Sequence, residues 1–283
     1  MADTDFYFEY KGIYLTSFYH SPESMKYIEE FSFRPDDIFI VTYPKSGTTW
    51  SQEIVPLIMS GGDSVSVETL PYQDRTPWIE DTRLADLHFE ERPSPRIFTT
   101  HMPYNTMPPS FYKVKPKVIY VKRNPKDVMI SAFHYFGKIP HYKDPGTLTE
   151  FLHKFLDGSK LPYGSWFDHV KSWMNVEDKE RIIYLNYEDM VQNLEDSVAS
   201  IAKFLDKSLD TEVIEKIAKK CLFKNMKNRL SNNSTNPSID ERMAELFRKG
   251  IVGDWKNHLS EEEAKYFDAV CKEKMTDVKC KWD

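Results

Sequence analysis

Residues 43–50, with the sequence YPKSGTTW, combine the residue types that bind phosphate groups. Gly47 has no side chain, so the backbone can approach a ligand closely, and the amides of a helix starting at Thr48 would point toward an anion. Lys45 adds a mobile positive charge, and Trp50 offers a flat apolar face for a purine. Hydroxyl donors come from Ser46, Thr48 and Thr49. We therefore expect a phosphate-binding loop rather than an ordinary turn with a solvated lysine.

The order of these residues differs from that of a Walker A loop. Here the lysine precedes the glycine (K-x-G-T), whereas in a Walker A loop the glycine precedes the lysine (G-K-T). Two other cationic segments are candidates for contact with a bound anion. Arg123 lies directly after an apolar run, and Arg248-Lys249-Gly250 places two adjacent cations beside a glycine. Surface ion pairing is the alternative for both segments, but a place after a strand end favours ligand binding for Arg123.

His101 follows another apolar run and is a candidate general base. A neutral imidazole can take the proton of an attacking hydroxyl, and an unperturbed pKa of about 6.5 keeps much of it neutral at pH 7. Four other histidines are interpreted as capping or packing residues: His20, His88, His153 and His258. His134 and His141 are instead candidates for the lining of a pocket.

Short apolar runs rich in β-branched residues alternate with helix-forming segments. The predicted strands are 37–43, 96–100, 117–121 and 182–185, and the predicted helices are 48–55, 126–136, 191–205, 211–221 and 260–274. Pro56 is expected to kink or end the first helix, and Ser260 with Glu263 to form a capping box before the last. Residues 225–250 show little periodicity and are a predicted loop or lid. The alternation indicates a mostly parallel sheet with helices on both faces.

Composition limits the functions that the chain can have. The 283 residues carry a net charge of −6, so a general affinity for nucleic acid or an anionic membrane is not expected. No apolar run approaches the ~20 residues of a membrane span, and the acidic start of the chain is unlike a secretion signal, which predicts a cytosolic protein. The three cysteines have no C-x-x-C spacing and fit reduced thiols, and we identify no metal-ligand cluster.

Segment 43–50 resembles the phosphosulfate loop of the cytosolic sulfotransferases, whose sulfuryl donor is 3′-phosphoadenosine 5′-phosphosulfate. Three further segments are similar to that family in the same order: 99–103 (TTHMP), 123–128 (RNPKDV) with Ser131, and 248–257 (RKGIVGDWKN). Residues 163–169 (YGSWFDH) and 75–78 (RTPW) look closest to its hydroxysteroid branch. The resemblance implies one α/β domain over residues 1–283, similar to the P-loop kinases, with a mostly parallel five-stranded central sheet flanked by helices.

The resemblance also implies a role for each site residue. His101 would be the general base, and Lys45 would stabilise charge on the leaving oxygen, with Ser131 as a third catalytic residue. The donor would be bound by Lys45, Ser46, Gly47, Thr48, Thr49, Trp50, Arg123, Ser131, Tyr187, Cys221, Phe223, Met226, Arg248, Lys249 and Gly250. A small hydrophobic acceptor would lie against Tyr14, Phe18, Trp78, His101, Phe136, Ile139 and Tyr163.

The implied reaction is in-line transfer of a sulfuryl group to a hydroxyl of a steroid or another alcohol, without a metal, in steroid and lipid metabolism or detoxification. Phenols or amines as acceptors, a nucleotide-dependent phosphotransferase, and a nucleotide or steroid carrier without turnover are the alternatives. The chain departs from the family pattern at Thr100, Cys221 and Asn233. Segment 256–265 keeps only the first lysine of the family's dimer motif, which leaves a homodimer open.

Overall fold

A parallel sheet lies at the centre of the chain. Its strands are ordered β4 (Ile97–Thr100), β3 (Ile38–Thr42), β5 (Lys117–Lys122) and β6 (Ile182–Asn186), and each neighbouring pair is parallel. This confirms the predicted α/β class. The computed structural model describes residues 6–158, 160–232 and 248–278, and within them the central sheet has four strands, so the expected number of five was wrong.

One isolated bridge lies beyond β4 at the edge of the sheet. Trp78 pairs with Thr99 of β4 in an isolated parallel bridge. Pro77 precedes it and has no amide proton to donate, which limits the ladder to this point. The other two strands, β1 (Tyr7–Tyr10) and β2 (Ile13–Thr16), form a separate antiparallel hairpin that the sequence analysis did not identify. Lys11 and Gly12, both at positive φ, make its turn.

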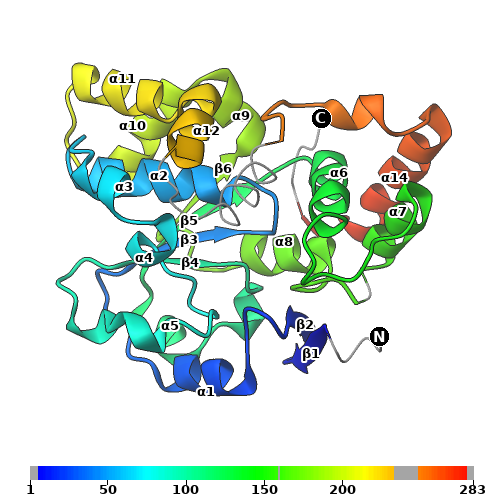
Figure 1. Cartoon of the computed structure of the whole chain (residues 1–283), viewed down its shortest axis with the longest axis horizontal. Helices are drawn as coiled ribbons and strands as arrows, with labels where there is room; N and C mark the ends of the chain where they lie inside the picture. Colours follow the sequence, from blue (N-terminus) through cyan, green and yellow to red (C-terminus); the bar gives the residue numbers. More distant parts are fainter. Residues whose placement is uncertain (1–5, 159, 233–247, 279–283) are drawn as a thin grey trace.

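Helices cover both faces of the sheet. The helices α2 (Thr48–Met59), α10 (Leu194–Phe204) and α11 (Thr211–Lys220) lie above it in Figure 1, and their apolar side chains pack on Ile40, Ile119 and Val121. On the lower side are α1 (Pro22–Glu30) and α5 (Pro109–Val114), over a core rich in aromatic rings that includes Phe39 and Phe98. Burial on both sides explains why the sheet strands read as continuous apolar runs.

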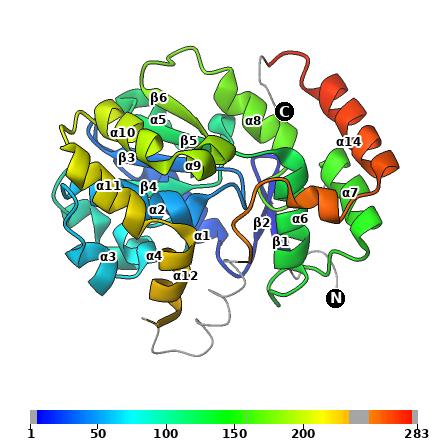
Figure 2. The ribbon, with the colours of Figure 1, turned by 90° about the horizontal axis from the view of Figure 1, so that it is seen from above.

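A third group of helices stands beside the sheet rather than over it, as Figure 2 shows from above. It contains α6 (Pro125–Phe136), α7 (Leu148–Asp157), α8 (Trp166–Met174) and α14 (Glu261–Lys274), which share one hydrophobic cluster. Ser260 and Glu263 form the predicted capping box of α14, and Thr147 and Glu150 form an equivalent one for α7.

Several predicted element boundaries were wrong for identifiable reasons. Helix α2 continues through Pro56 to Met59, because the Gln52 carbonyl that a residue at 56 would normally bond accepts instead from Arg75 Nη1 at 3.3 Å. The predicted helix 191–205 is two helices, α9 (Tyr187–Gln192) and α10, with Asn193 capping the second. Helix α12 (Phe223–Asn232) occupies the start of the predicted loop 225–250. Residues 233–247, including Asn233, lie outside the described residues.

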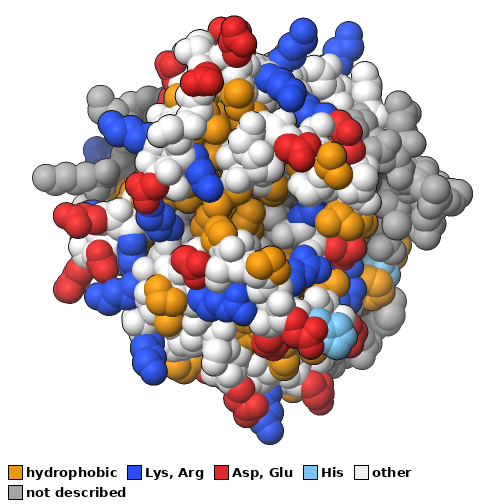
Figure 3. Space-filling view, turned by 90° about the vertical axis from the view of Figure 1, so that its left-hand side faces the viewer, with side chains coloured by type: hydrophobic (Ala, Val, Ile, Leu, Met, Phe, Trp, Pro, Cys, Tyr) orange, Lys and Arg blue, Asp and Glu red, His pale blue; other side chains and the backbone are white. Residues whose placement is uncertain are grey.

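The remaining short elements connect these layers. They are α3 (Val65–Thr69), α4 (Tyr72–Arg75) and the 3-10 helices η2 (Ala85–Leu87), η3 (Phe89–Glu91), η4 (Tyr104–Thr106) and η5 (Asp254–Asn257). None of the helices in the described ranges is long and apolar enough to cross a membrane. Figure 3 shows Lys and Arg interspersed with Asp and Glu on one face of the molecule, around hydrophobic side chains near its centre.

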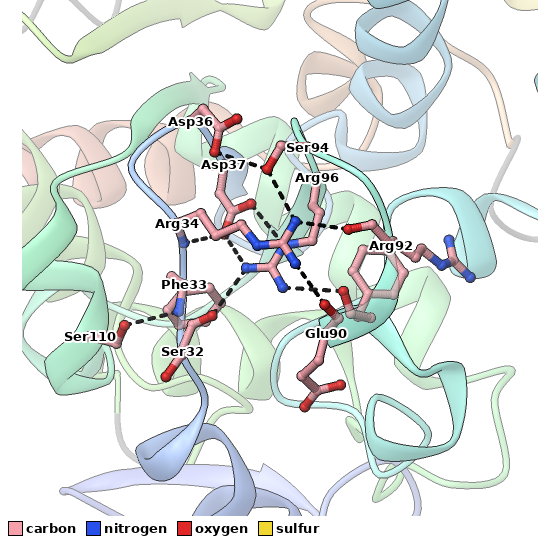
Figure 4. Close-up of polar contacts among 11 residues, drawn as sticks. Ser32, Phe33, Arg34, Asp36, Asp37, Glu90, Arg92, Ser94, Arg96 and Ser110 are labelled. Carbon is pink, nitrogen blue, oxygen red and sulfur yellow. Dashed lines mark hydrogen bonds and ion pairs between the residues drawn. The ribbon is translucent and has the colours of Figure 1, made fainter.

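A polar cluster joins the amino ends of β3 and β4 (Figure 4). Arg96, directly before β4, binds both carboxylate oxygens of Asp37, directly before β3, at 2.9 and 2.6 Å, and both side chains are buried. Arg34 donates to the carbonyls of Arg92 and Glu90 at 2.8 and 2.6 Å. Because each buried charge has hydrogen-bonding partners, the cluster fixes this edge of the sheet.

Candidate active site

The carboxyl ends of all four parallel strands lead into predicted site residues. Strand β3 leads into the loop that ends at Gly47, β4 into His101, β5 into Arg123 and β6 into Tyr187. The chain passes from β3 to β4 on one side and then to β5 on the other, the arrangement at which open α/β sheets bind ligands. A cavity of about 730 Å³ opens at this edge, lined by residues from all four connections.

Most of the predicted site residues line this cavity. On the donor side these are Lys45, Gly47, Thr48, Thr49, Trp50, Arg123, Ser131, Tyr187, Phe223, Met226, Arg248, Lys249 and Gly250, and on the acceptor side Phe18, Trp78, His101, Phe136 and Tyr163. Four predicted residues are not part of the lining: Ser46, Cys221, Tyr14 and Ile139. The structure therefore brings most of the predicted donor residues together around one cavity and places these four residues outside its lining.

The predicted phosphate loop has the geometry of an anion cradle. Gly47 is the N-cap of α2, with φ 107°, and no side chain in the described part of the chain caps the helix start. A Cβ at Gly47 would lie 3.0 Å from the ring of Tyr187, so the loop requires glycine here. Ser46 lies just beneath the cavity surface, where its buried Oγ has no hydrogen-bond partner among the described residues. The open amides and this hydroxyl fit a phosphate or sulfate group.

Lys45 occupies a strained position at the mouth of the loop. Its φ is +70°, in the left-handed region that non-glycine residues rarely adopt. Its ammonium nitrogen lies 3.9 Å from the centroid of the Tyr135 ring, and both residues line the cavity. The ring and the backbone together hold the positive charge inside the cavity.

Arg123 joins two loops that are far apart in the sequence. Its Nη1 donates to the Lys45 carbonyl at 3.0 Å and its Nη2 to the Ile251 carbonyl at 3.3 Å, while its guanidinium lies 4.3 Å from the centroid of the Tyr187 ring. Its buried Nε has no partner among the described residues. Arg123 is thus well placed to offer a donor to an anion between the loops.

Arg248 and Lys249 are the adjacent cations that the sequence predicted. Both contact the buried carboxylate of Asp254, Arg248 Nη1 at 2.7 Å from Oδ2 and Lys249 Nζ at 2.6 Å from Oδ1. Burial alone would raise the pKa of Asp254, but hydrogen bonds from Lys249, Asn257 and Arg248 hold this pKa well below its usual range. The carboxylate is therefore ionised and fixes both cations at the cavity wall.

Aromatic side chains line the part of the cavity beyond the phosphate loop. Trp50 lies edge-on to Tyr187, with centroids 5.4 Å apart, and its indole donates to the Cys221 carbonyl at 2.8 Å. Phe223 and Met226 come from the start of α12. The Cys221 side chain is fully buried and is not part of the cavity lining, whereas its backbone carbonyl positions Trp50.

His101 is held as a neutral base. Its Nδ1 lies 2.6 Å from the Thr42 carbonyl, and because a carbonyl oxygen only accepts, Nδ1 carries the proton and Nε2 keeps a free lone pair. Burial lowers the pKa of His101 to about 3, with smaller contributions in the same direction from His20 and Lys45. The Thr42 hydroxyl also contacts Thr48 at 2.6 Å, which links the base to the start of α2.

Glu80 and His20 are two neighbours of His101 that the sequence analysis missed. Glu80 accepts from the His101 backbone amide at 2.9 Å, and burial raises the pKa of this carboxyl to about 7. His20, which we interpreted as a packing residue, lines the cavity and contacts the Tyr163 hydroxyl through Nε2 at 2.9 Å. His20 Nδ1 lies 2.9 Å from the Thr16 carbonyl, so Nε2 accepts and the Tyr163 hydroxyl donates.

The acceptor side is built from rings that surround His101. Trp78 and Tyr163 lie 4.3 and 5.0 Å from its imidazole, measured between centroids. Phe136 stacks on Tyr142 at 4.5 Å, and half-exposed Phe18 stacks on His141 at 3.3 Å near the opening. These rings form an apolar wall in which His101 presents a polar atom.

Four of the expected pocket residues have other roles. Tyr14 lies outside the cavity and uses its backbone carbonyl to accept from the Tyr163 amide at 2.8 Å, and Ile139 is buried beneath the surface. His141 lies outside the lining and packs against two lining residues, Phe18 and Tyr19, and His134 packs edge-on against His258 at 5.1 Å. Each supports a residue that lines the cavity or a neighbouring loop.

Comparison with known proteins agrees with this geometry. The sulfotransferase domain model matches residues 35–279. Sulfotransferase 2B1 of Mus musculus is 43% identical over 98% of this chain and 83% of its own length, and the 3-beta-hydroxysteroid sulfotransferase of Cavia porcellus is 40% identical over 97% and 96%. The crystal structure of mouse sulfotransferase SULT7A1 complexed with PAP superposes with a TM-score of 0.80, at 30% identity over 97% of this chain and 96% of that one.

No group of three or more His, Cys, Asp or Glu side chains in the described ranges is arranged to hold a metal ion. The family model matches most of the chain, and both relatives align over nearly all of this chain and most of their own length. The fold is shared as well. This chain belongs to the sulfotransferase family.

Proposed function

We propose that this protein transfers the sulfuryl group of 3′-phosphoadenosine 5′-phosphosulfate to a hydroxyl of a small hydrophobic acceptor, a steroid or another alcohol. The observation that carries the proposal is the meeting of an anion cradle, two groups of cations and a neutral histidine in one cavity. A donor with phosphates at two positions needs positive charge at two places. Lys45 supplies one, and Arg123 with Arg248 and Lys249 supplies the other.

In the proposed reaction, the acceptor oxygen forms a bond to the sulfur atom of the donor. At the same time, the bond between this sulfur and the 5′-phosphate oxygen breaks. His101 Nε2 takes the proton of the hydroxyl, since Nδ1 is occupied by the Thr42 carbonyl. The Lys45 ammonium stabilises the negative charge that develops on the leaving phosphate oxygen. Ser131, near the middle of α6, lines the same cavity and donates a hydrogen bond from its hydroxyl to the nucleotide.

The acceptor wall supports a flat, apolar substrate. Trp78, Phe136 and Tyr163 surround the base, and one of the relatives is named for 3-beta-hydroxysteroids. Phenols and amines are the alternative acceptors, because the same neutral imidazole can take a proton from either. We extend the proposal to one domain over residues 1–283, with the phosphosulfate loop at 43–50 and the 3′-phosphate elements at 123–131 and 248–250, in the cytosol. A homodimer stays a prediction.

The test is incubation of the purified protein with labelled donor and a panel of steroids, aliphatic alcohols, phenols and amines. His101→Ala should lower turnover at least about 100-fold and leave the affinity for adenosine 3′,5′-bisphosphate nearly intact, because the imidazole serves the acceptor. Lys45→Ala should lower kcat and weaken donor binding as well. His153→Ala on the exposed surface of α7 is the matched control and should behave like the wild type.

Two results would count against this proposal. Undiminished turnover in His101→Ala would remove that residue from the mechanism. Transfer of phosphate from ATP without transfer of sulfate would replace the proposed reaction with a phosphotransferase.

A further inference from the structure

The two cations at residues 248 and 249 do not stand freely in the cavity. Asp254 holds Arg248 through one carboxylate oxygen and Lys249 through the other, at 2.7 and 2.6 Å. Asn257 also donates to Asp254 at 3.0 Å, and His258 Nε2 lies 3.3 Å from it. The Asp254 side chain is 1% exposed, whereas that of Lys249 is 43% exposed, so the order of the lysine depends on the carboxylate.

A second buried carboxylate holds the backbone of the same segment. Asp127, on α6, accepts from the Gly253 amide at 2.7 Å and from the Trp255 amide at 3.0 Å. Arg123 binds the Ile251 carbonyl of this segment, and a Cβ at Gly250 would lie 2.3 Å from the ring of Phe223. Residues 248–255 are therefore tied to α6, to the end of β5 and to α12 before any ligand arrives.

We infer that Asp127 and Asp254 are positioning residues that fix the cations for the 3′-phosphate of the donor and thereby set the preference for nucleotides that carry this group. The inference rests on the proposed nucleotide site. Neither carboxylate lines the cavity, so each acts through other residues: Asp254 through Arg248 and Lys249, and Asp127 through the backbone between them and α6.

Removing the Asp254 charge has two opposing consequences. It takes a negative charge away from the neighbourhood of a phosphate, which favours binding, and it releases two long side chains that must then be ordered by the ligand, which disfavours binding. Arg248 and Lys249 line the cavity and Asp254 does not, so a bound phosphate would lie farther from the carboxylate than from the cations, and the repulsion between carboxylate and phosphate is the smaller of the two effects. The loss of order should therefore exceed the electrostatic gain.

The experiment compares two 5′-phosphorylated adenosines that differ only at the 3′ position. Dissociation constants for adenosine 3′,5′-bisphosphate and adenosine 5′-phosphate are measured by calorimetry for the wild type, Asp254→Asn, Asp127→Asn and Asp206→Asn. Asp206 pairs with Lys117 at the opposite edge of the sheet and controls for the change in net charge. The thermal midpoint of each variant is recorded beside the binding data.

We expect Asp254→Asn to raise the dissociation constant of the bisphosphate at least tenfold and that of the monophosphate less than twofold. Asp127→Asn should show the same difference between the two nucleotides to a smaller degree. Asp206→Asn should change neither constant by more than twofold. Equal losses for both nucleotides would mean a general structural role, and unchanged or tighter bisphosphate binding would mean that the repulsion dominates; either result overturns the inference. A wild-type protein that binds the two nucleotides equally would count against the proposed nucleotide site itself.

Discussion

The protonation state of His101 gives a prediction whose size follows from the structure. The perturbation is a change of pH from 8 to 5.5, in the Glu80→Gln background. This background is needed because Glu80 contacts the His101 amide and has a pKa raised by burial to about 7, so its own titration falls inside the range. The amide introduced by this substitution would keep the oxygen that accepts from His101 without the charge.

We expect no fall in kcat/KM toward acid pH. An ordinary histidine with a pKa of about 6.5 would be only about one-tenth neutral at pH 5.5, which would lower the rate about tenfold. Burial lowers the pKa of His101 to about 3, so the base stays neutral over the whole range. His20, whose pKa is lowered by burial to about 4, also stays neutral. The rate should therefore change less than twofold.

The assay is kcat/KM for an aliphatic alcohol, which does not titrate here, with the donor saturating at every pH so that donor binding does not enter. The wild type is measured in parallel, and a limb near pH 7 in the wild type alone would be the titration of Glu80. A tenfold fall by pH 5.5 that persists in Glu80→Gln would refute the reasoning, because it would show a base with an ordinary pKa.

Three further predictions concern stability and binding. In the folded protein the pKa of Glu80 is raised from 4.5 to about 7, so ionisation of this carboxyl opposes folding increasingly above pH 4.5 and fully above pH 7. Glu80→Gln should therefore raise the free energy of unfolding by about 3 kcal/mol at pH 8 and change it little near pH 4.5. Denaturant titration at the two pH values measures this difference. Arg96→Ala should cost about 3–5 kcal/mol in the same assay, since it leaves the Asp37 carboxylate buried without its partner, and a loss below 1 kcal/mol would contradict this. Gly250→Ala should weaken bisphosphate binding at least about tenfold by the clash with Phe223, and Phe223→Ala in the same chain should recover part of that loss.

The parts of the site that could be predicted from the sequence follow buried strands. Loop 43–50, His101 and Arg123 each come directly after an apolar run, and parallel strands bring such positions to one edge. His20 could not be found in this way, because it follows the small β1–β2 hairpin and its partner Tyr163 is 143 positions away. No local pattern marks a contact of that range.

Errors in the predicted elements came from tertiary contacts that override local signals. Pro56 does not end α2, since Arg75 satisfies the carbonyl that proline leaves without a donor. Helix α12 forms in a polar segment because Phe223 and Met226 pack against the sheet layer. The side chain of Cys221 is buried in the core, and its carbonyl positions Trp50, a contact that no local sequence pattern marks.

The ion pair of Asp37 and Arg96 lies at the amino edge of the sheet, whereas the cavity opens at the carboxyl edge. The strands between the ion pair and the cavity are short, but each is hydrogen-bonded to its neighbour along its length. This rigid layer separates a substitution at the amino edge from the cavity at the carboxyl edge. Protein engineering can use this separation. Heat-tolerant variants are best sought at positions near this ion pair but outside it, because Arg34 and Arg96 lie away from the cavity lining, and an immobilisation tag is best attached on that side.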